Sequence, residues 1–181
     1  MRIVLAGVAT LALLAGCART TETVAEPMPS SGTADDMGAE TTLRDAGGIE
    51  KGRATITTAG DAMRLTLDVQ GMPPGPHGVH FHTVGRCDPP SFEGAGPHWN
   101  PTGRQHGRDN PQGAHAGDVP NISVDGNGRG TLTVDVPGSL ASLMDADGAA
   151  LIVHAAPDDY RTDPSGNSGA RLACGVLARS S

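Results

Sequence analysis

Aromatic residues are almost absent from this sequence of 181 residues, which has one tryptophan, one tyrosine and two phenylalanines. A folded core must therefore be built from valine, leucine, isoleucine and alanine. Positive charge is also scarce, since 13 lysine and arginine residues face 20 aspartate and glutamate residues, for a formal net charge of -7. Proteins bind nucleic acids through clustered cations that neutralise phosphates, and no basic patch is visible. The composition therefore argues against a nucleic-acid partner.

No amphipathic helical pattern appears after the N-terminal segment, whereas glycine (26) and proline (14) are abundant. From Leu43 onward, apolar and polar residues alternate or form short apolar runs, which is typical of strands. Strands are predicted at 63–69, 122–124, 132–136, 149–155 and 172–177. The turn sequence DGNG at 125–128 predicts a β-hairpin between the second and third of these. The fold class is therefore all-β, either a sandwich or a flattened barrel.

Two segments, 86–118 and 156–170, interrupt this pattern with many Gly, Pro, Asn and Asp residues. Long connections without periodicity are uncommon inside a compact domain, and they are usually functional or disordered. Most of the residues that could bind a metal lie in these two segments. We therefore expect two long loops that form the functional site.

The first 16 residues have the pattern of a signal peptide. Arg2 precedes an uncharged, mostly apolar run over 3–16, which is shorter than the about 20 residues that span a membrane. The run ends in Leu-Ala-Gly before Cys17, which resembles the lipobox of bacterial lipoproteins. The resemblance implies cleavage before Cys17 and a diacylglyceryl group on its thiol. A plain secretory signal with an incidental cysteine is the alternative.

Residues 17–41 are predicted to be the lipidated cysteine and a flexible tether, because 18–41 is small, polar and acidic without apolar periodicity. Residues 42–181 are predicted to be the folded domain. The expected location is the periplasmic side of a bacterial cell envelope, with the chain held at the membrane by the lipid. Ala18 stands where an aspartate would favour retention in the inner membrane, so we favour the outer membrane.

The remaining two cysteines, Cys87 and Cys174, are the candidates for a disulfide. An exported chain meets an oxidising compartment, where such pairs form and persist. The bond would close a loop of more than eighty residues and contribute about 4–5 kcal/mol in the chain-entropy model. Two free buried thiols are the alternative.

Six of the seven histidines fall in a pattern that suggests metal binding. His80 and His82 are two positions apart on a predicted strand, so they share one face, while Val79 and Phe81 face the core. A second group lies within residues 98–118, and three imidazoles with one carboxylate are enough for a closed zinc site. This group is His98, His106, His115 and Asp118. A polar loop that is merely rich in histidine is the alternative.

Five motifs together resemble those of copper/zinc superoxide dismutases, in the order of that family and over roughly residues 43–178. They are GVHFH at 78–82, GPHWNP at 96–101, AHAGD at 114–118, VHAAPDD at 153–159 and GNSGARLACGV at 166–176. The resemblance implies an eight-stranded Greek-key β-barrel. It implies one copper ion per subunit held by His80, His82, His98 and His154. It implies one zinc ion held by His98, His106, His115 and Asp118.

The resemblance also implies roles for residues around the metals. Asp158 would receive N–H bonds from one ligand of each metal, and Arg171 would line the copper channel and attract superoxide. His98 would bridge the two metals as an imidazolate and help to deliver a proton. Cys87 and Cys174 would form the family's disulfide within the subunit. His77, the seventh histidine, would hydrogen-bond neighbouring backbone and hold no metal.

The implied activity is conversion of superoxide to oxygen and hydrogen peroxide by alternating reduction and oxidation of copper. The segment 160–169 is short and contains no lysine, so the sequence gives no basis for expecting strong electrostatic steering of the substrate. The chain could be a monomer or a homodimer. Two other functions remain open: a protein that buffers copper or zinc without turnover, and an adhesive or structural β-sandwich lipoprotein. The second leaves the organised histidines unexplained.

Overall fold

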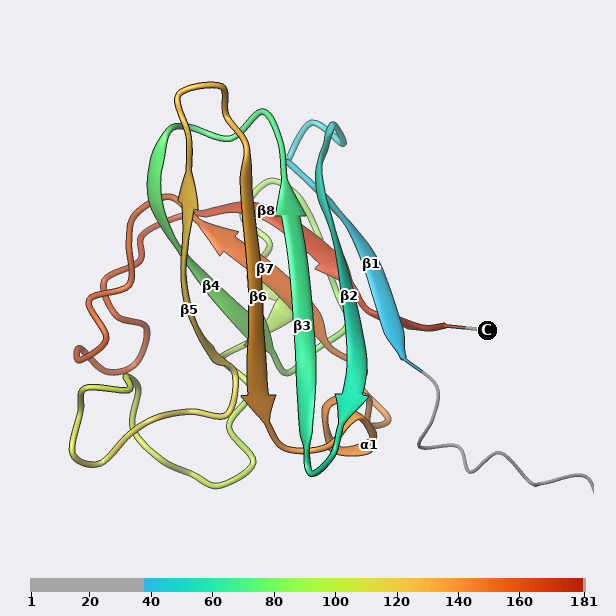
Figure 1. Cartoon of the computed structure of the whole chain (residues 1–181), viewed down its shortest axis with the longest axis vertical. Coiled ribbons are helices and arrows are strands. Elements are labelled where there is room, and N and C mark those ends of the chain that lie inside the picture. Colours follow the sequence, from blue (N-terminus) through green and yellow to red (C-terminus); the bar gives the residue numbers. More distant parts are fainter. Residues whose placement is uncertain (1–37, 181) are drawn as a thin grey trace, which may run out of the picture. The chain divides into compact units, whose positions relative to one another are not determined.

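The computed structural model describes residues 38–180, which form a nearly closed β-barrel of antiparallel strands (Figure 1). The strands, in chain order, are β1 (Ala39–Arg44), β2 (Glu50–Ala59), β3 (Ala62–Val69), β4 (Gly75–His82), β5 (Asp118–Val124), β6 (Gly130–Pro137), β7 (Ala150–His154), β8 (Arg171–Val176) and β9 (Ala178–Arg179). Two short helical segments accompany them, η2 (Glu93–Ala95) and α1 (Leu140–Leu143).

Eight of the strands follow one another around the barrel in the order β5-β4-β7-β8-β1-β2-β3-β6, and the short β9 pairs with β1. The chain passes from β3 to β4 and from β6 to β7 without pairing them, which are the crossovers of a Greek key. The predicted eight-stranded antiparallel barrel is therefore confirmed.

The predicted hairpin around the DGNG turn is wrong as a strand pair. The turn itself forms, since the N–H of Gly128 donates to the Asp125 carbonyl oxygen at 3.0 Å. However, β5 pairs with β4 and β6 pairs with β3, with Met63 opposite Val136. No ladder of paired residues joins β5 to β6 within 38–180, although the two strands contact each other at the seam of the barrel.

The domain begins earlier than the predicted boundary at 42, because β1 starts at Ala39. The side chains of Ala39, Thr41 and Leu43 are buried, and Ala39 lies opposite Ile56 of β2. The sequence of this strand has small and polar side chains and so shows no hydrophobic alternation. The strand forms through backbone hydrogen bonds to the neighbouring strand β2. The predicted signal peptide (1–16), the lipid site at Cys17 and most of the tether lie outside the described residues. Within those residues, no helix is both long and apolar enough to cross a membrane.

The core is aliphatic, as the composition predicts, and it orients the histidine-bearing strand. Val79 and Phe81 are fully buried in the main hydrophobic cluster, so alternation sends His80 and His82 to the opposite face of β4. The single-turn helix α1 was not predicted, because four residues are too few to show a helical period. The side chain of Ser139 caps it by accepting the N–H of Ser142.

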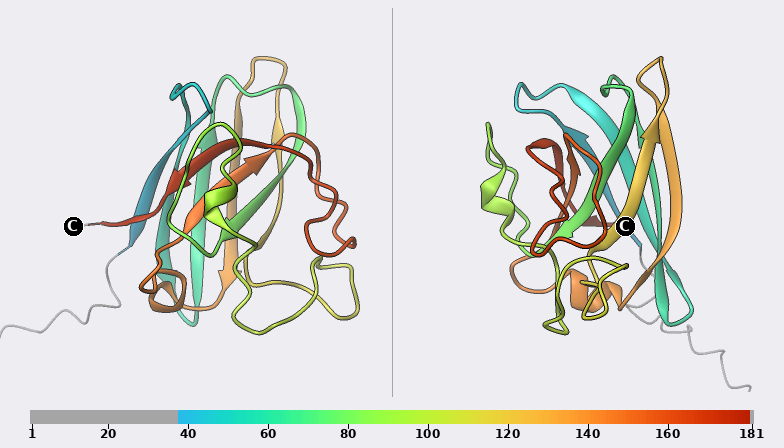
Figure 2. Two further views of the ribbon diagram at one scale, coloured as in Figure 1. Left: turned by 180° about the vertical axis from the view of Figure 1, so that it is seen from behind. Right: turned by 90° about the vertical axis from the view of Figure 1, so that its left-hand side faces the viewer.

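Two long loops lie together on one side of the barrel (Figure 2). The first spans 83–117, between β4 and β5, and includes η2; the second spans 155–170, between β7 and β8. They correspond to the two long segments predicted from the sequence. Backbone bonds dock both onto the β4 strand: Trp99 donates to Phe81 at 2.7 Å, and Gly78 donates to Ala156 at 2.9 Å. The outward face of β4 is thereby covered by both loops.

Candidate metal centre

Four buried histidines from two strands and one loop form what we call the four-histidine cluster, which is His80, His82, His98 and His154. The first two lie on the outward face of β4, and His154 ends the neighbouring strand β7. The loop histidine reaches them because Trp99, the next residue, is bonded to the backbone of Phe81. One ligand nitrogen from each ring lies within 4.8 Å of the others.

Each of these rings has a nitrogen with no hydrogen-bond partner. The Nδ1–H of His82 donates to the carbonyl oxygen of Gly96 at 2.8 Å, which leaves a lone pair on its Nε2. Across residues 38–180, the buried side-chain atoms without a partner are His80 Nδ1, His82 Nε2, His98 Nε2, His106 Nδ1 and His154 Nε2. We call these the open nitrogens. A buried polar atom without a partner costs about 1–3 kcal/mol, so neutral imidazoles with converging lone pairs fit a metal ion.

A second group, the mixed cluster, adjoins the first and consists of His98, His106, His115 and Asp118. The Asp118 Oδ1 atom lies 3.0 Å from Nδ1 of His98, 3.0 Å from Nδ1 of His106 and 3.3 Å from Nδ1 of His115. Its other oxygen accepts the backbone N–H groups of Gly107 and His115, at 2.9 and 3.0 Å. One carboxylate thus gathers three imidazoles and shapes the loop that carries all three of them.

The two clusters share His98 and lie in contact. Its Nδ1 faces Asp118, whereas its Nε2 is one of the open nitrogens. Its ring stacks on that of His80 with centroids 3.9 Å apart. One possible ligand atom of His80 also lies within 4.8 Å of possible ligand atoms of His98, His106 and Asp118.

The carboxylate of Asp158 connects the two clusters. Its oxygens accept the Nε2–H of His80 at 2.9 Å and the Nε2–H of His106 at 3.0 Å. Two residues that sequence reasoning missed hold it in place. The side chain of Asn121 on β5 donates to the Asp158 carbonyl oxygen and accepts its N–H, at 2.9 and 2.8 Å. The backbone N–H of Tyr160 donates to the carboxylate at 2.6 Å.

Burial keeps three of the imidazoles neutral. It lowers the pKa of His82 to about 2, of His154 to about 3 and of His98 to about 4, assisted by repulsion from neighbouring imidazoles. Desolvation penalises the charged form of a histidine, so these rings keep a lone pair at neutral pH. Neutral imidazole is the form that binds a metal.

His106 behaves differently because two carboxylates face it. Burial lowers its pKa, but the contacts with Asp118 and Asp158 outweigh burial and raise the pKa to about 9. Burial raises the pKa of Asp118, yet the three imidazoles beside it and the backbone N–H of Gly107 hold it well below its usual range. Asp118 is therefore an ionised carboxylate, which is a ligand suited to a divalent cation.

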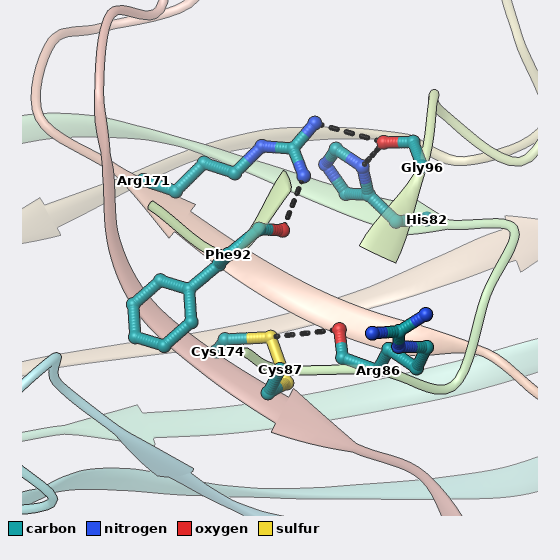
Figure 3. The surroundings of a disulfide bond; sticks show 7 residues. All are labelled: His82, Arg86, Cys87, Phe92, Gly96, Arg171 and Cys174. Atoms are coloured by element: carbon teal, nitrogen blue, oxygen red, sulfur yellow. Dashed lines mark hydrogen bonds between the residues drawn. A yellow bond between two sulfur atoms is a disulfide. The ribbon is translucent and has the colours of Figure 1, made fainter. Parts of the chain in front are cut away.

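The side chain of Arg171 joins β8 to the first long loop beside the four-histidine cluster (Figure 3). Its guanidinium donates to the carbonyl oxygens of Phe92 at 2.6 Å and Gly96 at 2.8 Å. The Gly96 oxygen also accepts the His82 Nδ1–H, so one carbonyl connects Arg171 to a histidine of the cluster. Burial lowers the pKa of Arg171, but an arginine remains charged at any physiological pH.

A disulfide between Cys87 and Cys174 fastens the same loop to β8, with Cα atoms 5.7 Å apart. The disulfide is therefore confirmed, and the alternative of two free thiols is excluded. His77 lies outside both clusters. Its ring nitrogens lie 2.7 Å from the carbonyl oxygens of His154 and Pro73, which is the backbone contact that the sequence implied.

An eight-stranded antiparallel barrel in which three strands and a long loop bring six histidines and an aspartate into adjoining clusters defines a protein with a paired-metal centre. The family model described as "Copper/zinc superoxide dismutase (SODC)" matches residues 50–177. Cu-Zn superoxide dismutase 2 of Aquifex aeolicus is 39% identical over 155 residues, which cover 82% of this chain and 91% of that protein.

Solved structures agree with this match. A SOD-like protein from Bacillus subtilis superposes with a TM-score of 0.74 at 37% identity, over 78% of this chain and 99% of that one. The Cu/Zn superoxide dismutase from Brucella abortus superposes with a TM-score of 0.65 at 28% identity, over 77% and 98%. The chain belongs to the copper/zinc superoxide dismutase family, whose members are oxidoreductases with copper and zinc as cofactors.

Proposed function

We propose that the four-histidine cluster holds copper and the mixed cluster holds zinc, with His98 shared by both. The open nitrogens carry this proposal. Four of the five belong to the four-histidine cluster, and the fifth is Nδ1 of His106 in the mixed cluster. Four imidazole nitrogens suit copper, and three imidazoles with a carboxylate suit tetrahedral zinc. We assign His115 rather than His80 to zinc, because the Nε2 of His80 is bonded to Asp158 and its Nδ1 is an open nitrogen.

Bound copper supplies the one-electron redox chemistry that converts two superoxide anions and two protons into oxygen and hydrogen peroxide, while zinc holds the loop without changing oxidation state. Arg171 attracts the anion and orients it beside the cluster, since its guanidinium and His82 share the Gly96 carbonyl. When it does not bind copper, the Nε2 of His98 has no other partner and can hold one of the two protons.

The test is the rate of superoxide decay with the purified protein, loaded first with zinc alone and then with zinc and copper. We expect decay that depends on copper and proceeds over many turnovers. If copper is bound but decay does not accelerate, the proposal fails, and a protein that buffers metals becomes the better account.

We further propose that the chain is exported, cleaved after residue 16 and anchored through lipid on Cys17, facing the periplasm from the outer membrane. The lipobox-like sequence supports the anchor, and the Cys87–Cys174 disulfide is typical of an oxidising compartment. The intact mass of the protein from bacterial membranes tests this proposal. Cleavage without a lipid adduct, or a Cys17→Ala protein that stays with the membrane, would contradict it.

A further inference from the structure

The side chain of Asp163 belongs to the second long loop but contacts the first. Its Oδ1 accepts the backbone N–H of His106 at 2.6 Å, across 57 positions of the chain. The same oxygen lies 3.9 Å from Nε2 of His115. Asp163 therefore faces two members of the mixed cluster without belonging to it.

These two contacts act on different parts of the two histidines. The ring of His106 is held by Asp118 and Asp158, whereas Asp163 holds its main chain. The ring of His115 has Asp118 on its Nδ1 side and Asp163 on its Nε2 side. A carboxylate near Nε2 favours a proton there, which leaves the Nδ1 lone pair free for a metal.

The two loops are closely packed where Asp163 makes these contacts. Gly107 follows His106 with a φ of 100°, and a Cβ atom there would overlap the carbonyl oxygen of Tyr160. That carbonyl oxygen also accepts the N–H of Asp109 at 3.0 Å. The backbone positions of the two loops are therefore fixed against each other, so Asp163 is held at the mixed cluster.

We propose that Asp163 is a positioning residue for zinc, through which the second long loop sets the zinc affinity of the first. This inference rests on the proposed function of the mixed cluster as a zinc site. Groups that orient metal ligands typically change metal affinity about 10- to 100-fold when they are removed. Asp163→Ala removes both contacts and should weaken zinc binding by about that factor. Asp163→Asn keeps an oxygen for the His106 N–H but loses the charge beside His115, so it should weaken binding less.

The experiment measures Zn²⁺ affinity of the purified metal-free protein by competition with a chromogenic chelator. The visible spectrum of Co²⁺ bound in place of zinc reports ligand geometry, which a loss of stability alone would not alter. Asp109→Ala is the matched control. The side chains of Asp109 and Asp163 are both 47% exposed, and Asp109 pairs with Arg108 at 4.0 Å, whereas Asp163 faces a histidine.

The inference is supported if Asp163→Ala weakens zinc binding more than Asp163→Asn does and both variants shift the Co²⁺ spectrum. The control Asp109→Ala should bind zinc and Co²⁺ like the wild type. It is overturned if Asp163→Ala binds zinc within threefold of the wild type, or if the control weakens binding equally. Asp118→Ala distinguishes this failure from failure of the proposed function. If Asp118→Ala also leaves zinc binding unchanged, the mixed cluster is not the zinc site and both conclusions fail.

Discussion

Removal of the disulfide by Cys87→Ala together with Cys174→Ala should lower the stability of the metal-free protein substantially. The two cysteines are separated by 87 positions. In the chain-entropy model this loop corresponds to about 15 cal/mol/K, or about 4.6 kcal/mol at 25 °C. Cys174 is also buried against Phe92 and Ile152, so its truncation removes some packing in addition.

The assay is urea unfolding of the metal-free double variant and of the metal-free wild type. Metals are left out because ligands that bind only the folded state add their own stabilisation. The double variant should also show a larger dependence of the unfolding free energy on urea, since an unfolded chain without the cross-link exposes more surface. Reduction of the wild type with a thiol should reproduce the loss of stability without the packing change.

A loss below about 1 kcal/mol would refute the reasoning, because the closed loop would then constrain the unfolded chain very little. A functional effect should accompany the loss. The disulfide fastens the loop whose Phe92 and Gly96 carbonyls hold Arg171, so turnover of the metal-loaded double variant should fall even at temperatures where it is folded.

Four further predictions concern the metal centre. Asp118→Ala should lower zinc content and melting temperature, and a chelator should then have no further effect on melting. Arg171→Ala should retain both metals by elemental analysis and slow superoxide decay roughly tenfold or more; an equal loss of copper would count against its role in attracting substrate. Gly166→Ala should reduce zinc content, because Gly166 has a φ of 63° and a Cβ atom would overlap the carboxylate of Asp158 and lie 2.6 Å from Nε2 of His106. In the metal-free protein the pKa of His106 is raised from 6.5 to about 9, so its stabilising contribution is complete below pH 6.5 and is lost as the pH rises through 9. Urea unfolding at the two ends of that range should show the fall, and His106→Asn should abolish it.

The chemistry of the centre was largely readable from the sequence because its parts are short and local. Alternation on one strand places His80 and His82 on the face opposite Phe81, and the four-histidine cluster includes both of them. The ordered motifs identified the family, and with it the barrel. The pairing of Cys87 with Cys174 followed from the expected compartment and from the family resemblance, and it is present.

The tertiary structure alone decided which strands pair and which groups hold the metal-binding side chains. The β5 and β6 strands flank a strong turn, yet β5 pairs with β4 and β6 pairs with β3. The β1 strand begins at Ala39 through backbone bonds that no side-chain pattern encodes. Asn121 and Asp163 reach Asp158 and His106 across 37 and 57 positions. Contacts of this kind depend on where the folded loops bring distant backbone N–H and C=O groups, and local residue types do not specify that placement.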